Sequence, residues 1–556
     1  MGHGAALTGV SWLWRLAPPL IATVIAVPVL TIAVQLFAPS GEVWGHLVDT
    51  VLWRYVGNTV WLGFGVGFGT LVLGTGTAWL CVMCRFPGRG VLEWALLLPL
   101  AVPTYAIAFT YAGMLDFAGP LQSALREAFG WTRHDYWFPE IRSLGGAIAV
   151  MSLVLYPYVY LLARASFLNQ SVCALEIGRT LGRGPWASFF AIGLPLARPA
   201  LAGGVSLALM EALSDFGTVQ YYGVDTFTTG IYRTWFGLGD AGAAAQLSAV
   251  LLLFVALLLI LEQASRGGAR YHHTSGRYRP LPSYNLRGTR MWLATLACLL
   301  PLALAFLFPA LQLGIWTIET WREMVDTHFA GLAWNSFRLA ALTAVLAVAV
   351  ALILAYAVRL GAGLLGRAAA RVASLGYAVP GSVIAVGVLV PFAALDTGID
   401  GFARDTFGVS TGLLLTGGLA ALVFAYIVRF LAVALRAVEA GLTKVSPAMD
   451  DAARTLGCTP GRVLWRVHVP VVRAGLISGG LLVFVDVMKE LPATLIMRPF
   501  NFDTLAVRAY ELAADERLAD SASAALAIVA VGLVPVLILG RAVGRARPGS
   551  QAPALP

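Results

Sequence analysis

Charge is scarce in this sequence, and lysine is nearly missing. Of its 556 residues 12% are charged, and Lys444 and Lys489 are the only lysines among 38 basic residues. Hydrophobic residues make up 59% of the chain, and its mean hydropathy is +0.79. Soluble domains are about 25% charged and about 45–50% apolar. The composition therefore excludes a soluble globular protein and predicts a membrane protein that crosses the bilayer many times.

A phosphate-binding loop is also missing. The P-loop pattern G-x-x-x-x-G-K-[ST] needs a lysine directly after a glycine, and neither Lys444 nor Lys489 follows one. The chain therefore does not itself bind ATP through a P-loop, and any energy it uses must come from a partner or from an ion gradient. The basic residues behind the net charge of +9 lie at the ends of apolar runs, as in membrane proteins. We therefore predict no nucleic-acid partner.

The five cysteines form no disulfide framework. Cys81 and Cys84 make a C-x-x-C pair at the end of an apolar run, but a metal site would need a second pair or a histidine cluster. We interpret the two as small helix residues. The sequence shows no constellation of histidine, serine or metal ligands typical of an enzyme. We predict no catalytic residue, no metal site and no cofactor.

Twelve apolar stretches are long enough to span a bilayer, since a spanning helix needs about 18 or more apolar residues. We therefore predict an all-α polytopic membrane protein with about twelve transmembrane helices, arranged as two parallel six-helix repeats. The predicted helices are 16–37, 58–84, 92–115, 144–165, 199–222, 244–264, 291–316, 334–358, 372–395, 411–435, 475–497 and 522–541.

These helices divide the chain into four parts. Residues 1–264 and 291–545 are predicted to form the two repeats, 265–290 a basic cytoplasmic linker and 546–556 a disordered tail. Arginines gather in the linker and in alternate loops, so the positive-inside rule places both termini and the linker in the cytoplasm. Because each repeat has an even number of helices, both have the same orientation, which predicts a pathway between them.

One polar segment occurs in both repeats, inside long loops at 166–198 and 436–474. The two copies lie 275 positions apart. Their matched residues are Glu176, Arg179, Gly182 and Pro195 in the first copy and Asp451, Arg454, Gly457 and Pro470 in the second.

The second copy predicts a helix, a glycine turn and another helix. Ser446 is a good N-cap, Pro447 suits the first helical position, and Gly457 fits a left-handed stop. Thr459 and Pro460 restart a helix by the same chemistry. Such a helix pair is suited to insert into a groove of a partner protein. The alternative is a loop that only joins two membrane helices, but these loops are far longer than a joiner needs.

Other residues match in the same order at nearly the same offset, which favours duplication over chance. They are Asn58 with Asn335, Pro103 with Pro380, and Val224–Phe227 with Phe502–Leu505.

Two predicted membrane helices carry paired acids. Glu211 and Asp215 lie in the fifth helix, and Asp486 and Glu490 lie in the eleventh, each pair on one face at spacing i, i+4. A charge at bilayer depth costs about 2.5–3.5 kcal/mol or more, so it usually faces a cavity or a partner. One interpretation is a polar substrate pathway. The alternative is a set of structural hydrogen bonds near the helix ends, with Lys489 as one internal partner.

The repeated segment resembles the EAA loop of permease subunits in bacterial ATP-binding cassette importers. That loop carries a Glu-Ala-Ala triplet, a glycine and a final Leu-Pro. The copies here contain Glu176-Ile-Gly and Asp451-Ala-Ala, and they end in Leu194-Pro and Val469-Pro. The fused two-half arrangement resembles the iron(III) branch of these permeases, as do Asp215-Phe-Gly-Thr-Val and Glu490-Leu-Pro-Ala-Thr.

This resemblance implies a type I importer permease fold in a bacterial inner membrane, in contact with lipid. ATPase subunits, in two copies, would dock at the eight matched loop residues, and a periplasmic binding protein would deliver the substrate. Ferric iron is the implied substrate, with thiamine, phosphonate or polyamine as alternatives. The rival from another class is an ion-coupled secondary transporter, which explains the membrane acids but not two matched docking loops.

Overall fold

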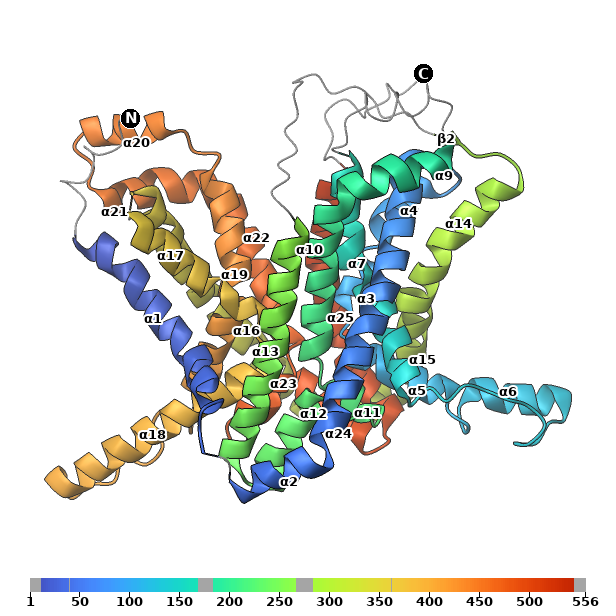
Figure 1. Ribbon diagram of the computed structural model, residues 1–556, viewed down its shortest axis with the longest axis horizontal. Coiled ribbons are helices and arrows are strands. Elements are labelled where there is room, and N and C mark those ends of the chain that lie inside the picture. Colours follow the sequence, from blue (N-terminus) through green and yellow to red (C-terminus); the bar gives the residue numbers. More distant parts are fainter. Residues whose placement is uncertain (1–11, 40, 169–183, 267–283, 362, 545–556) are drawn as a thin grey trace. The chain divides into compact units, whose positions relative to one another are not determined.

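The computed structural model describes residues 12–39, 41–168, 184–266, 284–361 and 363–544, and these are almost entirely helical (Figure 1). The predicted all-α fold is confirmed. The elements before the predicted linker are α1 (Trp12–Gln35), α2 (Glu42–Thr50), α3 (Leu52–Met83), β1 (Cys84–Arg85), α4 (Arg89–Ala95), η1 (Leu98–Ala101), α5 (Thr104–Leu115), α6 (Pro120–Phe129), α7 (Leu144–Leu168), α9 (Pro185–Ser188), η2 (Phe189–Gly193), α10 (Leu194–Ser214), α11 (Gly217–Tyr221), α12 (Phe227–Tyr232), η3 (Arg233–Gly237) and α13 (Ala241–Arg266).

The elements from Tyr284 onward, of which β2 and the start of α14 still lie within the predicted linker, repeat much of this order. They are β2 (Tyr284–Asn285), α14 (Thr289–Leu302), η4 (Ala303–Leu307), α15 (Phe308–Met324), α16 (Thr327–Arg359), α17 (Gly363–Ala373), η5 (Leu375–Ala378), α18 (Gly381–Phe407), α19 (Leu419–Leu442), α20 (Pro447–Thr455), α21 (Pro460–Val463), η6 (Leu464–His468), α22 (Val469–Met488), α23 (Pro492–Met497), α24 (Leu505–Ala514) and α25 (Leu518–Gly544). Among the described residues, β1 and β2 form the one strand pair, and it is parallel.

The number of spans agrees with the prediction. Eleven helices in the described ranges are long and apolar enough to cross a membrane, and one bent pair would make a twelfth. Lipid-facing surface is visible on α13, where Leu253, Leu257 and Leu261 are each more than half exposed. A row of exposed leucines on a long helix is typical of a surface that meets hydrocarbon rather than water.

The predicted third helix, 92–115, is not one straight helix. It is bent by 92° between the η1 and α5 segments, and the break lies at Pro103. Val102 is extended there, with φ −103° and ψ 129°, because proline disfavours a helical residue before it and has no N–H to donate. The matched Pro380 lies at the same place between η5 and α18, so the predicted ninth helix, 372–395, also begins late.

The predicted fifth and eleventh helices end early. Helix α10 stops at Ser214 and α22 stops at Met488, and the short helices α11 and α23 follow. Asp215 and Glu490 therefore lie just beyond the long helices, not on a face shared with the acid four residues earlier.

The halves repeat one another down to local irregularities. The π-helical turns η2 and η6 precede α10 and α22 at the offset of 275 residues. A repeated contact supports the duplication further. The Nδ2 of Asn58 donates to the carbonyl of Asp225 at 2.8 Å, and the Nδ2 of Asn335 donates to that of Asp503 at 3.2 Å. The matched asparagines and the matched aspartates, which are far apart in the sequence, thus make the same contact in each half.

The chain forms two compact units, and each combines segments from both predicted repeats. The first unit contains residues 1–50, 230–252 and 325–508, and the second contains 51–229, 253–324 and 509–556. In the first unit α1 packs against α16, α17 and α18. In the second unit α14 and α15 pack against α3, α4 and α5, and α25 packs against η1 and α15.

Candidate functional site

The second polar segment folds as the sequence predicts. Helix α20 begins at Pro447 after the extended Ser446, which holds the N-cap position with φ −68° and ψ 145°. The serine side chain makes no capping hydrogen bond, so the first proline and the backbone conformation set this start. Helix α21 begins in the same manner, with Thr459 at the N-cap and Pro460 first in the helix.

A Schellman turn separates the two short helices. Gly457 has φ +75°, a conformation that costs glycine nothing. Its N–H donates to the carbonyl of Arg454 at 2.9 Å, and the N–H of Cys458 donates to that of Ala453 at 3.0 Å. This pair of bonds satisfies the last carbonyls of α20. The predicted glycine stop is therefore present.

The outer face of α20 carries the matched charges. The side chain of Asp451 is 72% exposed and that of Arg454 is 49% exposed, with 4.0 Å between the carboxylate and the guanidinium. A surface pair at this distance contributes little to stability, so both groups are free to meet another chain. Pro470 and the matched Pro195 are the second residues of α22 and α10. Glu176, Arg179 and Gly182 lie outside the described residues.

The inner face of α20 carries contacts that sequence reasoning missed. Nε of Arg359 donates to Asp450 at 2.9 Å, and Nε2 of His468 lies 2.6 Å from the other oxygen of the same carboxylate. His468 is fully buried. Arg359 comes from α16 and His468 from η6, so Asp450 joins the exposed helix to two membrane helices. No sequence spacing pairs these residues, and the matched alignment points to Asp451 instead.

The first of the deeper acids caps a short helix. Oδ1 of Asp215 accepts from the N–H of Thr218 at 2.9 Å and of Val219 at 3.4 Å. These are the second and third residues of α11, whose N–H groups have no partner within the helix. The hydroxyl of Thr104, at the start of α5, also donates to the Asp215 carboxylate. A negative charge is favourable at a helix N-terminus.

Glu490 makes the same cap in the other half. Its two oxygens accept from the N–H groups of Ala493 and Thr494, both at 3.1 Å, which are again the second and third residues of the helix. Here a cation is added, because Nη1 of the buried Arg429 lies 3.4 Å from Oε1 of Glu490. Both acids are thus held by structural hydrogen bonds, as one of the two interpretations expects.

The other two acids remain on the long helices. Asp486 forms an ion pair with Lys489 at 2.9 Å, so lysine is an internal partner as anticipated. Glu211 is partly buried on α10. In the described residues no group of three or more His, Cys, Asp or Glu side chains is placed to hold a metal ion.

Comparison with known proteins identifies the kind of molecule. Residues 347–547, which include the second polar segment and Glu490, match the family described as binding-protein-dependent transport system inner membrane component. The matched stretch is a little over a third of the chain and resembles that permease family.

Relatives extend the likeness to most of the chain. The chain is 28% identical to the Fe(3+)-transport system permease protein FbpB 2 of Haemophilus influenzae, over 87% of this chain and 88% of that protein. It is 24% identical to the ferric transport system permease protein FbpB of Actinobacillus pleuropneumoniae, over 86% and 69%. The molybdenum transport system permease protein ModB of Escherichia coli is 27% identical, over 35% of this chain and 84% of its own. The resemblance to a fused permease is confirmed.

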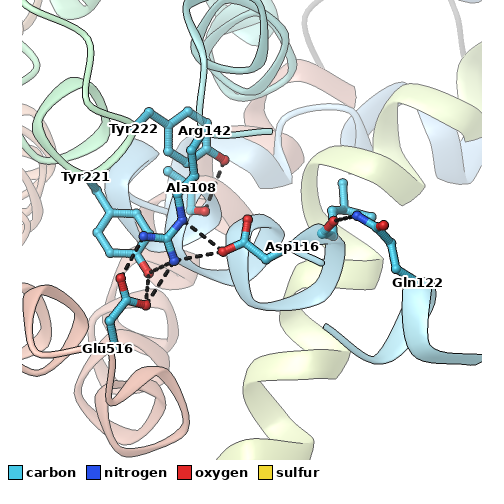
Figure 2. A network of polar contacts seen from close by, with 8 residues as sticks. Ala108, Asp116, Gln122, Arg142, Tyr221, Tyr222 and Glu516 are labelled. Carbon is cyan, nitrogen blue, oxygen red and sulfur yellow. Dashed lines mark hydrogen bonds and ion pairs between the residues drawn. The ribbon is translucent and has the colours of Figure 1, made fainter. Parts of the chain in front are cut away.

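A second polar cluster holds the segment between α5 and α7, residues 116–143, which is called the excursion below (Figure 2). Arg142 donates to both oxygens of Glu516, at 2.6 and 2.9 Å, and to Asp116 at 2.8 Å. The hydroxyl of Tyr221 lies 3.1 Å from the same guanidinium. The hydrogen bonds raise the pKa of Arg142 above its ordinary value and lower that of Glu516. The cluster ties the start of α25 to the excursion, beside a cavity of about 610 Å³.

Proposed function

We propose that this chain is the transmembrane subunit of an ATP-driven importer and that its substrate is ferric iron. The observation that carries the substrate is the alignment with Fe(3+)-transport and ferric transport permeases along more than four-fifths of the chain. The molybdenum relative covers about a third of it. Phosphonate, thiamine and polyamine remain the alternative cargoes within the same class.

ATPase subunits on separate chains would supply the energy, one at each polar segment. The proposal is supported by the absence of a P-loop in the sequence and by the exposed charges of Asp451 and Arg454 on α20. A short helix with one exposed charged face and one anchored face is suited to a groove in a partner. We place Glu176, Arg179 and Gly182 in the equivalent role for a second ATPase copy.

The orientation follows from the positions of arginine. With both termini and the linker in the cytoplasm, α20 faces the cytoplasm, whereas α11, α23 and the Arg142 cluster face the periplasm. A periplasmic binding protein would deliver the substrate to that outer side. ATP binding would then draw the docked segments together and switch the permease between inward-facing and outward-facing states.

We assign the four membrane acids to the substrate pathway, with two different contributions. Asp215 and Glu490 hold the ends of α10 and α22 in place by capping. Glu211 and Asp486, which remain on the long helices, are the better candidates for contact with a cation. Glu211→Gln and Asp486→Asn should therefore reduce uptake with unchanged unfolding, whereas Asp215→Ala and Glu490→Ala should reduce uptake and lower the unfolding temperature. All four variants should retain the docked ATPase.

The decisive experiment is uptake of radiolabelled ferric iron by a deletion strain that carries this chain together with the ATPase and the binding protein encoded beside it. Uptake that needs ATP and all three components supports the proposal. Uptake of molybdate or phosphonate in place of iron would overturn the cargo. Uptake that survives ATP depletion but collapses with an uncoupler would overturn the importer in favour of a secondary transporter. Changing Gly457 to valine should release the ATPase. The control is Gly461→Ala, because nothing lies within 4 Å of a Cβ added at Gly461.

A further inference from the structure

One partly buried polar network holds the docking helix α20 to the membrane helices. Asp450 lies at its centre, with Arg359 from α16 on one oxygen and His468 from η6 on the other. Arg359 also donates to the carbonyls of Leu442 at 2.9 Å and Val445 at 2.8 Å. These carbonyls belong to the end of α19 and the residues after it. Two membrane elements therefore meet on one carboxylate of α20, and Arg359 links them to the end of α19.

The histidine completes the network in its neutral form. Its Nδ1 is buried and has no hydrogen-bond partner in the described part of the chain, so an imidazolium there would bury an unsatisfied N–H. The Nε2–H therefore donates to Asp450, and the charge of the carboxylate is balanced by Arg359. Tyr356 packs on the His468 ring at 5.1 Å and donates to the carbonyl of Pro460 at 2.8 Å. Both short helices are thus bonded to α16.

The first half has no polar residue at any of the three positions. Residues of α3 match residues of α16 at the same sequence offset that relates Asn58 to Asn335. At this offset Val82 matches Arg359. At the offset of the polar segment, Leu175 matches Asp450, and Gly193 matches His468. Leu175 lies outside the described residues.

In the described part of the first half, the positions that match Tyr356 and His468 are in apolar packing. A Cβ added to Gly193 would lie 2.7 Å from the ring of Trp79, and Trp79 corresponds to Tyr356. Trp79 also packs on Phe189 with 4.9 Å between ring centroids. These contacts contain no charge-assisted hydrogen bond, whereas the multiply bonded charge network of the second half fixes one geometry.

We propose that Arg359, Asp450 and His468 form the joint through which movement of the second ATPase is transmitted to α16 and α22, and that the first half transmits without such a joint. The inference rests on the proposed importer function and names the residues that couple its second docking site to the membrane. These are positioning residues, since they touch neither ATP nor substrate. Hydrogen-bond networks and rigid secondary elements are among the structures that carry coupling of this kind.

The test separates docking from coupling. Asp450→Asn keeps the shape of the side chain and removes its charge. In proteoliposomes with the ATPase and binding protein, we expect the variant to retain the docked ATPase and its ATP hydrolysis. Substrate moved per ATP should fall about fivefold, as for a residue that carries about 1 kcal/mol of coupling. The triple change Arg359→Val, Asp450→Leu, His468→Gly, which installs the first-half residues, should give the same loss.

The control is an arginine–aspartate ion pair outside the network. Nε of Arg517 donates to Asp520 at 2.7 Å near the start of α25, and Asp520→Asn should leave transport per ATP unchanged. An unchanged ratio in Asp450→Asn would overturn the inference, and so would loss of the docked ATPase, because that would make Asp450 a docking residue. If the unaltered chain retains no ATPase, the importer function itself fails, which is a different outcome.

A second measurement leaves Arg359, Asp450 and His468 unchanged and follows the distance between α20 and α16. Spin labels would be attached at Leu456, just after α20, and at Val345, on α16. These two residues lie in the same unit and are 83% and 68% exposed. With the native cysteines replaced, the distance between the labels should stay constant between nucleotide-free and ATP-bound complexes. A shift on ATP binding would show that α20 moves independently of α16 and would overturn the inference.

Discussion

At the scale of single residues, Asp215 and Glu490 make the same cap with a different charge balance. Each accepts from the second and third N–H groups of a short helix. Asp215 receives its further bond from the neutral hydroxyl of Thr104, whereas Glu490 faces the buried Arg429. The residue that matches Arg429 in the first half is Val154. Removal of the two acids should therefore have unequal consequences.

Glu490→Gln should destabilise the protein far more than Asp215→Asn. Breaking a buried ion pair from one side costs about 3–5 kcal/mol, because the partner charge stays buried, whereas loss of a helix cap costs about 1 kcal/mol. The measurement is the unfolding temperature of each variant in detergent. The double variant Glu490→Gln, Arg429→Leu should recover part of the loss. Equal shifts for the two single variants would contradict this account.

Glycine at position 381 makes room for the Arg429–Glu490 pair. An added Cβ would lie 2.1 Å from Nη1 of Arg429 and 2.5 Å from Oε1 of Glu490. Gly381→Ala should therefore separate the pair and lower the unfolding temperature. Gly398→Ala is the matched control on the same helix, since nothing lies within 4 Å of its Cβ, and alanine there should stabilise α18 by up to about 1 kcal/mol. Similar effects at both positions would contradict the steric explanation.

At the scale of elements, the Arg142 cluster fastens the excursion that contains α6 to the turn before α25. Glu516 supplies two of its bonds (Figure 2), and the bond to Arg142 lowers the pKa of Glu516 below its ordinary value of 4.5. A lowered carboxyl pKa contributes stability above the unfolded pKa, and this contribution is lost as pH falls through the folded value. The bonds between Arg142 and Glu516 should therefore be intact at neutral pH and weaken in acid.

Glu516→Gln should lower the unfolding temperature at pH 7, and its difference from the unaltered protein should shrink as the pH falls below about 4. Unfolding followed by intrinsic fluorescence across that range measures this, because Trp131 and Trp137 lie in the excursion. The exposed Glu127→Gln on α6 is the control and should show no pH-dependent difference. A difference for Glu516→Gln that persists unchanged into acid would rule out the ionised bond as its cause.

Local chemistry accounts for the elements that could be predicted from the sequence. Gly457 and the prolines at 447 and 460 act on their own backbone, so the turn and both short helices follow from residue type. The ends of α10 and α22 do not, because apolar residues continue past Ser214 and Met488. There the chain stops being helical where a carboxylate caps the next helix, a contact that composition does not reveal.

Long-range contacts account for what was missed. Asp450 bonds Arg359, 91 positions away, and His468, 18 positions away. Alignment of the two polar segments draws attention to what they share, and these residues are not shared. The joint is therefore invisible to a comparison of the repeats and appears only when α16, α20 and η6 are folded together.

At the scale of the whole molecule, each compact unit is built from both predicted repeats. In the first unit Gly387 of α18 lies against α1, where an added Cβ would be 2.5 Å from the carbonyl of Pro28. In the second unit the hydroxyl of Tyr111 on α5 donates to the carbonyl of Leu304 in η4 at 2.6 Å. Helices from before and after the linker thus cover one another's surfaces within each unit.

A chain divided in the linker should therefore assemble only when both parts are present. We expect fragments 1–277 and 278–556, expressed together, to co-purify and to support uptake. Each fragment expressed alone should be degraded, because Tyr111 in the first fragment and the carbonyl of Leu304 in the second would lose each other, and buried polar groups without partners cost about 1–3 kcal/mol each. The measurement is the membrane level of each tagged fragment with and without its partner. A fragment that accumulates alone and shows a cooperative unfolding transition would mean that each repeat is a self-sufficient domain, and that the exchange of helices between the units contributes little to their stability.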